Sequence, residues 1–164
     1  MINIRNAGLD DVSTISCVLA ASWKSAYRGI VHDEYLDALD NNHWVDFLNM
    51  GLKNKMIFAM VLEEEQNIIG AAILSGAKKD AHLMSFYLLP EKMGQGLGHI
   101  LYNGIETELR NRGFAKCELD VLGRNNRAIH FYKTHGFIDI NRKVHAKLGE
   151  QEYICNTYEK CLLI

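Results

Sequence analysis

Glycines at alternate positions, Gly94, Gly96 and Gly98, are the feature of this sequence with the clearest chemistry. They follow an apolar run that ends at Pro90 and precede an amphipathic helical pattern. Glycine lets the backbone approach an anion closely, and the free N–H groups at a helix start, aided by the helix dipole, bind that anion. The segment Leu88–Gly98 therefore predicts a phosphate-binding loop.

Two common phosphate-binding designs do not fit this loop. A P-loop ends in Gly-Lys and then Ser or Thr, because lysine neutralises phosphate and the hydroxyl holds magnesium, whereas this loop ends in Gly98-His99. A dinucleotide fingerprint needs glycine where His99 stands, although Glu118 lies about where its ribose-binding acid would be. A tight turn that only helps the helix to pack is the alternative that the glycines alone leave open.

A second set of residues, Asn125, Ala128 and Tyr132, lies at positions i, i+3 and i+7 of an expected helix. Seven residues fall about 20° short of two helical turns, so the three side chains share one stripe about 10 Å long. Polar residues at the ends of the stripe flank a small residue. Such an arrangement is suited to an extended ligand.

The elements that must position these residues follow from hydrophobic periodicity and turn residues. We expect strands at 2–5, 56–62, 68–74, 82–89 and 117–121, and a closing hairpin of 137–144 with 151–158. Helices are expected from Asp10, which would cap the first, to about Tyr27, and over 33–39, 42–52, 96–111 and 125–135. The strand at 82–89 is nearly apolar and is expected to be buried on both faces. We expect a single α/β (α+β) domain over residues 1–164.

Composition limits the class of protein. The net charge of −2 gives no electrostatic reason to expect binding to nucleic acid or to an anionic membrane. The sequence contains no basic, apolar leader and no apolar run of the length that spans a bilayer, so we expect a cytoplasmic protein. Four cysteines lie in apolar patterns without a C-x-x-C pair and are expected to be buried free thiols, as in a reducing compartment: Cys17, Cys117, Cys155 and Cys161.

Taken together, the segments Leu88–Gly98 and Asn125–Phe137 closely resemble the GNAT acetyltransferase superfamily, and the resemblance extends over about Phe58–Phe137. It implies a central mixed, mostly antiparallel sheet of about seven strands, with helices on both faces and with the fourth and fifth strands splayed. In that superfamily a Gln/Arg-x-x-Gly-x-Gly/Ala loop binds the pyrophosphate of acetyl-CoA. Its glycines correspond to Gly96 and Gly98, and Met93 stands where Gln or Arg is usual.

The resemblance implies acetyl-CoA as cosubstrate and no metal. The pantetheine arm would pair with the backbone of the fourth strand, and Asn125 would face it from the other side, although an asparagine here also suits a plain helix N-cap. The implied CoA-binding set is Tyr87, Leu88, Leu89, Met93, Gly94, Gln95, Gly96, Leu97, Gly98, Asn125, Ala128 and Tyr132.

Two residues are implied as catalytic. The hydroxyl of Tyr132 would lie near the CoA sulfur and donate a hydrogen bond or proton to the departing thiolate; a core tyrosine is the alternative. His82 stands at the start of the fourth strand, where family members often carry a carboxylate that accepts the amine proton through water, and it could equally be structural or solvent-facing. His130 and His135 lie about 140° apart around a helix, so they do not face one metal ion.

The amine acceptor is implied to bind against the N-terminal helices and the final hairpin, which points to Trp23, Tyr27, Tyr35 and Tyr153. Between Ile30 and Leu52 the sequence has acidic residues and no Lys or Arg, which would attract a cationic amine but also fits a solvated helix face. An exposed edge of the closing hairpin would allow a homodimer, although nothing in its sequence requires one.

The sequence thus favours an N-acetyltransferase that moves acetyl from acetyl-CoA to a primary amine of a small molecule or peptide by direct attack in a ternary complex. A non-catalytic CoA or acyl-CoA-binding sensor or interaction module is the alternative, and a preference for a longer acyl chain stays open.

Overall fold

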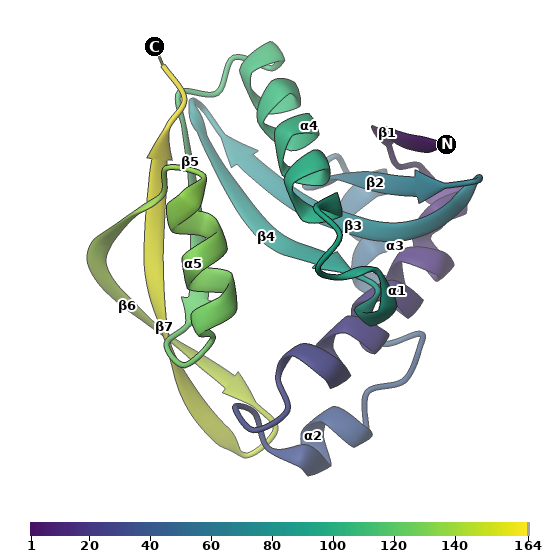
Figure 1. Cartoon of the computed structure of the whole chain (residues 1–164), viewed down its shortest axis with the longest axis vertical. Helices are drawn as coiled ribbons and strands as arrows, with labels where there is room; N and C mark the ends of the chain where they lie inside the picture. The colour runs from purple at the N-terminus through teal and green to yellow at the C-terminus, as the bar shows by residue number, and fades with distance from the viewer. Residues whose placement is uncertain (164) are drawn as a thin grey trace.

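The computed structural model describes residues 1–163 as one seven-stranded sheet covered by helices (Figure 1). The strands are β1 (Ile2–Asn6), β2 (Phe58–Glu64), β3 (Asn67–Ala77), β4 (Asp80–Leu88), β5 (Lys116–Leu122), β6 (Ile138–Leu148) and β7 (Gln151–Cys161). Their order is β1-β2-β3-β4-β5-β7-β6, and every neighbouring pair is antiparallel except β4–β5. The expected mixed, mostly antiparallel sheet is confirmed.

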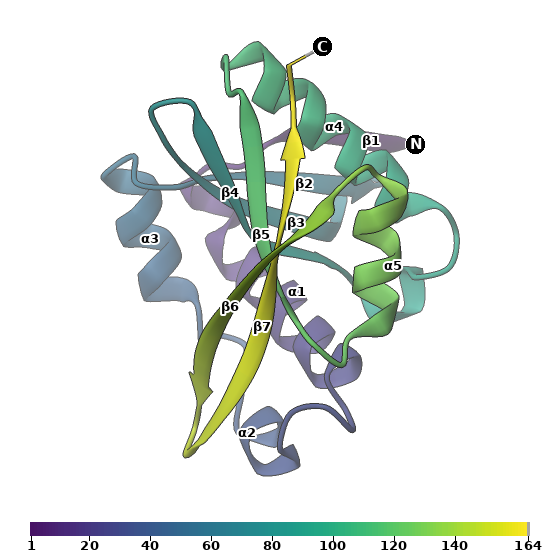
Figure 2. The same cartoon turned by 90° about the vertical axis from the view of Figure 1, so that its left-hand side faces the viewer.

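Helices pack on both faces of this sheet (Figure 2). They are α1 (Val12–Ala26), α2 (Asp33–Asp37), α3 (Val45–Lys53), α4 (Leu97–Asn111) and α5 (Asn126–Thr134), with short 3-10 turns at Leu9–Asp11 and Pro90–Lys92. One apolar core joins α4 and α5 to the sheet through residues such as Leu101, Ile105 and Tyr132. A second core on the other face joins α1 and α3 through Ile15 and Leu48. None of the helices within residues 1–163 has the length and apolar character needed to cross a bilayer.

The strands β4 and β5 separate after a short stretch of pairing, as expected. They pair at only three positions, from Asp80↔Lys116 to His82↔Glu118. On its other side β4 carries a bulge, because Ser85 pairs with Ile73 and Leu83 with Leu74, which leaves Met84 without an opposite residue. A bulge bends a strand and increases its twist. Figure 1 shows the two strands diverging below their common end, with α5 beside the opening.

Three local expectations are wrong. Asp10 does not cap α1, because the chain first makes the 3-10 turn, and Asp11 precedes the helix and accepts the N–H of Gly8 at 2.9 Å. The strand β4 is not buried on both faces, since Met84 is 43% exposed where pairing with β5 has ended. Cys17 and Cys161 are exposed, whereas Cys117 and Cys155 are buried as expected.

Candidate active site

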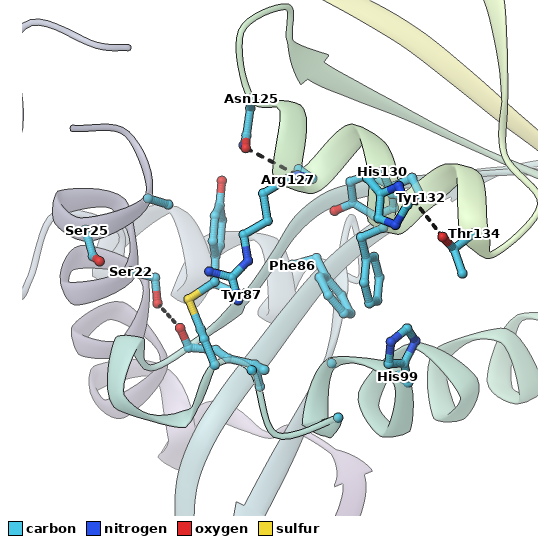
Figure 3. Close-up of a pocket in the computed structure, with 18 residues that line it drawn as sticks. Ser22, Ser25, Phe86, Tyr87, His99, Asn125, Arg127, His130, Tyr132 and Thr134 are labelled. Atoms are coloured by element: carbon cyan, nitrogen blue, oxygen red, sulfur yellow. Dashed lines mark hydrogen bonds between the residues drawn. The ribbon is translucent and has the colours of Figure 1, made fainter. Parts of the chain in front are cut away.

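A cavity of about 530 Å³ occupies the opening between β4 and α5 (Figure 3). It is lined by the end of α1, the end of β4, the glycine loop and one side of α5: Ser22, Ser25, Ala26, Phe86, Tyr87, Leu88, Met93, Gly94, Gly96, Gly98, His99, Asn125, Arg127, Ala128, His130, Phe131, Tyr132 and Thr134. Figure 3 shows Asn125 and Tyr132 on α5 facing Ser22 on α1 across this space. The two motifs found in the sequence therefore border one cavity.

The glycine loop presents backbone to the cavity. Gly94 and Gly96 have φ angles of +77° and +79°, which favour glycine, and Gly96 is the N-cap of α4. A glycine cap has no side chain to bind the first N–H groups of the helix, so these groups stay available to a ligand. A Cβ on Gly98 would lie 3.3 Å from Phe131, so glycine there lets α4 approach α5. The loop has the properties of an anion site.

The backbone of Leu88 also faces this cavity. Leu89 N–H donates to the Ile69 carbonyl at 2.8 Å, and peptide groups of neighbouring strand residues point in opposite directions, so those of Leu88 point away from β3. The Leu88 carbonyl accepts a hydrogen bond from Ser22 Oγ at 2.7 Å. The N–H of Leu88 is thus directed toward the opening, whereas that of Leu89 is committed to the sheet.

A second, smaller cavity of about 60 Å³ shares the stripe Asn125, Ala128 and Tyr132 with the larger one, together with Phe86 and Tyr87. It is also lined by residues of β5, which the larger cavity lacks. Asn125 Oδ1 accepts the Ala128 N–H at 3.3 Å, so this asparagine caps α5 as the alternative interpretation expected, while it also lines both cavities.

Tyr132 is 9% exposed and packs edge-on against Phe86 and Phe137. No hydrogen bond to its hydroxyl occurs among residues 1–163, and the residue lines both cavities. Burial raises the pKa of Tyr132, with a further contribution from nearby Tyr27. The hydroxyl is therefore protonated at neutral pH and can donate a hydrogen bond to a group in either cavity.

Sequence reasoning missed Asp120, which lines the smaller cavity from β5. Its Oδ1 accepts a hydrogen bond from Thr157 Oγ1 at 2.6 Å, and its Oδ2 lies 3.5 Å from His82 Nε2. His82 itself lines neither cavity and meets the smaller one only through Asp120. An acidic residue within the short strand 117–121 was the available signal. Tyr27 and Tyr87 also line the smaller cavity, and their hydroxyl oxygens lie 2.6 Å apart.

The expected acceptor aromatics are distributed unevenly. Tyr27 lines the smaller cavity, whereas Trp23, Tyr35 and Tyr153 line neither and belong to an apolar cluster behind it. Trp23 packs against Tyr27 with ring centroids 4.6 Å apart, and Tyr153 Oη accepts the backbone N–H of His32 at 2.9 Å. Trp23 and Tyr153 are thus engaged in contacts within the protein and do not line either cavity.

The acidic residues of the N-terminal helices are partly neutralised. Arg28 contacts Asp33 at 3.2 Å and Asp37 at 2.5 Å, and both carboxylates are exposed. This ion-pair network matches a solvated helix surface rather than a site that attracts cations.

The remaining members of the expected CoA set lie around the loop. Met93 lines the larger cavity, whereas Gln95 donates its side-chain amide to the Glu91 carbonyl at 3.1 Å and Leu97 is buried in the core. Arg127, which sequence reasoning did not single out, lies in the first turn of α5, and Figure 3 shows its side chain extending across the cavity toward Tyr87 and Ser22. The cavity therefore contains a cation beside the anion-binding backbone.

Histidines near the glycine loop do not form a metal site. His135 Nε2 lies 2.7 Å from His99 Nδ1, and His99 lines the larger cavity. Within residues 1–163, no three His, Cys, Asp or Glu side chains come together in an arrangement that could hold a metal ion.

Comparison with known proteins agrees with this geometry. Residues 19–137 match the model of the acetyltransferase (GNAT) family, which is well over half of the chain. A spermidine N(1)-acetyltransferase of Thermoplasma acidophilum is 26% identical over 141 residues, covering 83% of this chain and 88% of that protein. An uncharacterized N-acetyltransferase of Bacillus subtilis, YuaI, is 28% identical over 142 residues, covering 82% of this chain and 79% of that protein.

Among solved structures, the PaiA N-acetyltransferase of Thermoplasma acidophilum in complex with coenzyme A superposes with a TM-score of 0.79 at 25% identity. The match covers 98% of this chain and 99% of that one. The shared architecture thus extends over the full sheet, including the strands before and after the two motifs.

Proposed function

Because the chain belongs to the GNAT acetyltransferase family, we propose that it transfers the acetyl group of acetyl-CoA to a primary amine of a small molecule or peptide by direct attack in a ternary complex. The observation that carries this proposal is that two cavities share the stripe Asn125, Ala128 and Tyr132 as part of their lining. A donor in the larger cavity and an acceptor in the smaller one would meet at Tyr132.

The larger cavity suits the two parts of CoA that need polar partners. The N–H groups of the glycine loop and of the α4 N-terminus would hold the pyrophosphate, and Arg127 would supply the positive charge that Met93 lacks. The N–H of Leu88 would pair with the pantetheine arm or polarise the acetyl carbonyl. Ser22 binds the carbonyl of the next peptide group, Leu88–Leu89, whose N–H donates to the Ile69 carbonyl.

Acetyl transfer also requires a neutral amine and a proton for the departing sulfur. His82 would accept a proton from the amine through water, since an imidazole changes charge near neutral pH. The amine nitrogen then forms the new C–N bond, the C–S bond breaks, and Tyr132 donates its hydrogen bond to the sulfur as the thiol forms. The nitrogen loses a second proton as it becomes an amide, and this proton balances the one taken up by the sulfur, while the proton first accepted by His82 passes to solvent.

Because the Thermoplasma acidophilum relative is a spermidine N(1)-acetyltransferase, spermidine is the first acceptor to test. The experiment is a thiol-release assay with acetyl-CoA against polyamines, aminoglycosides, amino acids and peptide N-termini. We expect turnover on at least one class of amine. CoA binding without thiol release on the whole panel would contradict the proposal and would assign the chain to the non-catalytic CoA-binding class.

A further inference from the structure

Asp120 differs from the other carboxylates of the adjoining strands. Glu118 lies 3.5 Å from Lys116 and 3.2 Å from Arg142, and Glu159 lies 3.2 Å from Lys116. Asp120 has no Lys or Arg nitrogen within 4.0 Å among residues 1–163, although its side chain is only 26% exposed. Its negative charge is therefore left without a permanent cation at the wall of a cavity.

The Asp120 carboxylate is held in one orientation by the sheet. Asp120 and Thr157 are directly opposite in the register of β5 and β7, and the hydroxyl of the buried Thr157 donates to Oδ1 at 2.6 Å. Oδ2 lies 3.5 Å from His82 Nε2 on β4. A fixed carboxylate with one oxygen engaged by Thr157 keeps acceptor capacity for another donor.

The smaller cavity surrounds this carboxylate with groups that suit an amine. Tyr27, Ser85 and Tyr87 line it together with Asp120, and Tyr132 lines both this cavity and the larger one. A primary alkylamine has a pKa near that of lysine, about 10.4, and so arrives as an ammonium ion. An ammonium ion leaving water needs a charged or strongly polar partner.

We propose that Asp120 binds the ammonium group of the acceptor and thereby selects cationic alkylamines as substrates. The proposal rests on the acetyltransferase function above and adds the residue that receives the acceptor. Asp120 Oδ2 also lies 3.5 Å from His82 Nε2, so an ammonium group bound by the carboxylate would be held close to the ring proposed to take its proton. The amine lone pair released in this step is the one that attacks the thioester.

The same placement disfavours amino acids as acceptors. The α-carboxylate of an amino acid lies next to its amine and would be brought close to Asp120, where like charges repel. Amines on an alkyl chain without a neighbouring carboxylate avoid this repulsion. A diamine is therefore expected to be a better acceptor than an α-amino acid of similar size.

The test compares 1,8-diaminooctane with 1,8-octanediol, which has the same length and no charge. Each is titrated by calorimetry into the protein saturated with CoA, and the diamine is also assayed for turnover with acetyl-CoA. We expect the diamine to bind and the diol not to. Asp120→Asn should weaken diamine binding about 10- to 100-fold, the range expected for the loss of a hydrogen bond to a charged group. Affinity for CoA should be unchanged.

Asp80→Asn is the matched control, because Asp80 is a carboxylate at the start of β4, 60% exposed and outside both cavities. It should leave diamine affinity unchanged. Thr157→Val, which removes the hydroxyl that orients Asp120 while keeping the side-chain volume, should give an intermediate loss.

Equal diamine affinity in the wild type and Asp120→Asn would overturn the assignment, as would diol binding equal to that of the diamine or a wild type that does not bind the diamine. Failure of the acetyltransferase function would give a different result. The diamine would bind and Asp120→Asn would weaken that binding, but no amine would release thiol from acetyl-CoA.

Discussion

The two cavities that meet at Tyr132 are built in different ways. The anion site proposed for the larger one comes from consecutive residues, Gly94 to Gly98, and mostly from backbone. The smaller one takes side chains from distant segments, with Tyr27 from the end of α1, Tyr87 from β4 and Asp120 from β5. The first is encoded by local chain geometry, whereas the second exists only once the sheet has assembled. Substitutions should therefore separate the two sites cleanly.

Removal of the Tyr132 hydroxyl should have the largest effect, because this residue lines both cavities. Tyr132→Phe is expected to lower kcat about 100-fold, the lower end of the range for a positioned proton or hydrogen-bond donor, with CoA affinity and fold retained. The measurement is steady-state turnover on the acceptor found by the screen, together with calorimetry for CoA.

Tyr102→Phe is the control for this variant. Tyr102 is also buried, and its hydroxyl has no hydrogen-bond partner within residues 1–163 and lines neither cavity. Its removal should leave kcat unchanged and should not lower the free energy of unfolding, because an unpaired buried hydroxyl is itself costly. Equal kcat in Tyr132→Phe and wild type would remove Tyr132 from the chemistry.

The glycine loop should respond in cofactor affinity alone. Gly96→Ala puts a side chain at φ +79° and is expected to weaken CoA binding about tenfold, since the strain of about 1–2 kcal/mol is relieved by moving the loop. Gly113, at the other end of α4, has φ +84° and equally open surroundings. Gly113→Ala should lower the free energy of unfolding about as much as Gly96→Ala does, and it should leave CoA affinity intact. Matching losses of CoA affinity in both variants would mean that general destabilisation, not the loop, is responsible.

This contrast explains what the sequence predicted. Glycine at 94, 96 and 98 and the side chain of Asn125 determine local conformation by themselves, so the loop and the start of α5 could be predicted from these residues. The separation of β4 from β5 was instead implied by the family resemblance. Met93 was the departure that sequence left unexplained. Arg127, only two residues after Asn125, fills the same cavity with a cation, but which way its long side chain turns depends on tertiary packing.

Asp120 could not be predicted for a different reason. Its proposed role depends on Thr157 opposite it on β7 and on the absence, within residues 1–163, of a Lys or Arg nitrogen within 4.0 Å, and both follow from strand register rather than from neighbouring residues. Asp10 was mistaken for a helix cap because a single 3-10 turn shifts the helix start, a difference of the size that propensities do not resolve. Trp23 and Tyr35, expected from the resemblance near the acceptor, pack against an apolar cluster and line neither cavity, so their part in acceptor binding stays a prediction.

Substitution of Tyr27 should have the opposite selectivity to substitution of the glycine loop, because it should affect the acceptor and not CoA. Tyr27→Phe removes one member of the 2.6 Å hydroxyl pair with Tyr87 at the wall of the smaller cavity. We expect the KM for the acceptor to rise about fivefold, in line with roughly 1 kcal/mol for a lost hydrogen bond, with CoA affinity unchanged. If CoA affinity falls as much as acceptor affinity, the two cavities are not separable at this residue.

The smallest effect should come from His99, which lines the larger cavity, and its partner His135. Burial lowers the pKa of His135 from its ordinary value of 6.5, and His99 and Lys160 lower it further, against a weaker opposing effect of Glu106. The unfolded chain then binds more protons than the native one between the lowered pKa and pH 6.5, so the free energy of unfolding rises with pH in that window and is lost as the pH falls below 6.5. The hydrogen bond between His99 Nδ1 and His135 Nε2, at 2.7 Å, needs one nitrogen to donate and the other to accept, so protonation of both rings would break it.

Thermal unfolding measured from pH 7.5 to 5.5 should therefore show a midpoint that drops by a few degrees, and His135→Gln should reduce the drop. His145→Gln, at an exposed position on β6, is the control and should reproduce the wild-type slope. An undiminished slope in His135→Gln would show that this pair does not contribute to the pH dependence. A reduced slope would mean that acid weakens the α4–α5 contact beneath the cofactor cavity, and CoA affinity should then fall over the same pH range while the smaller cavity keeps its geometry.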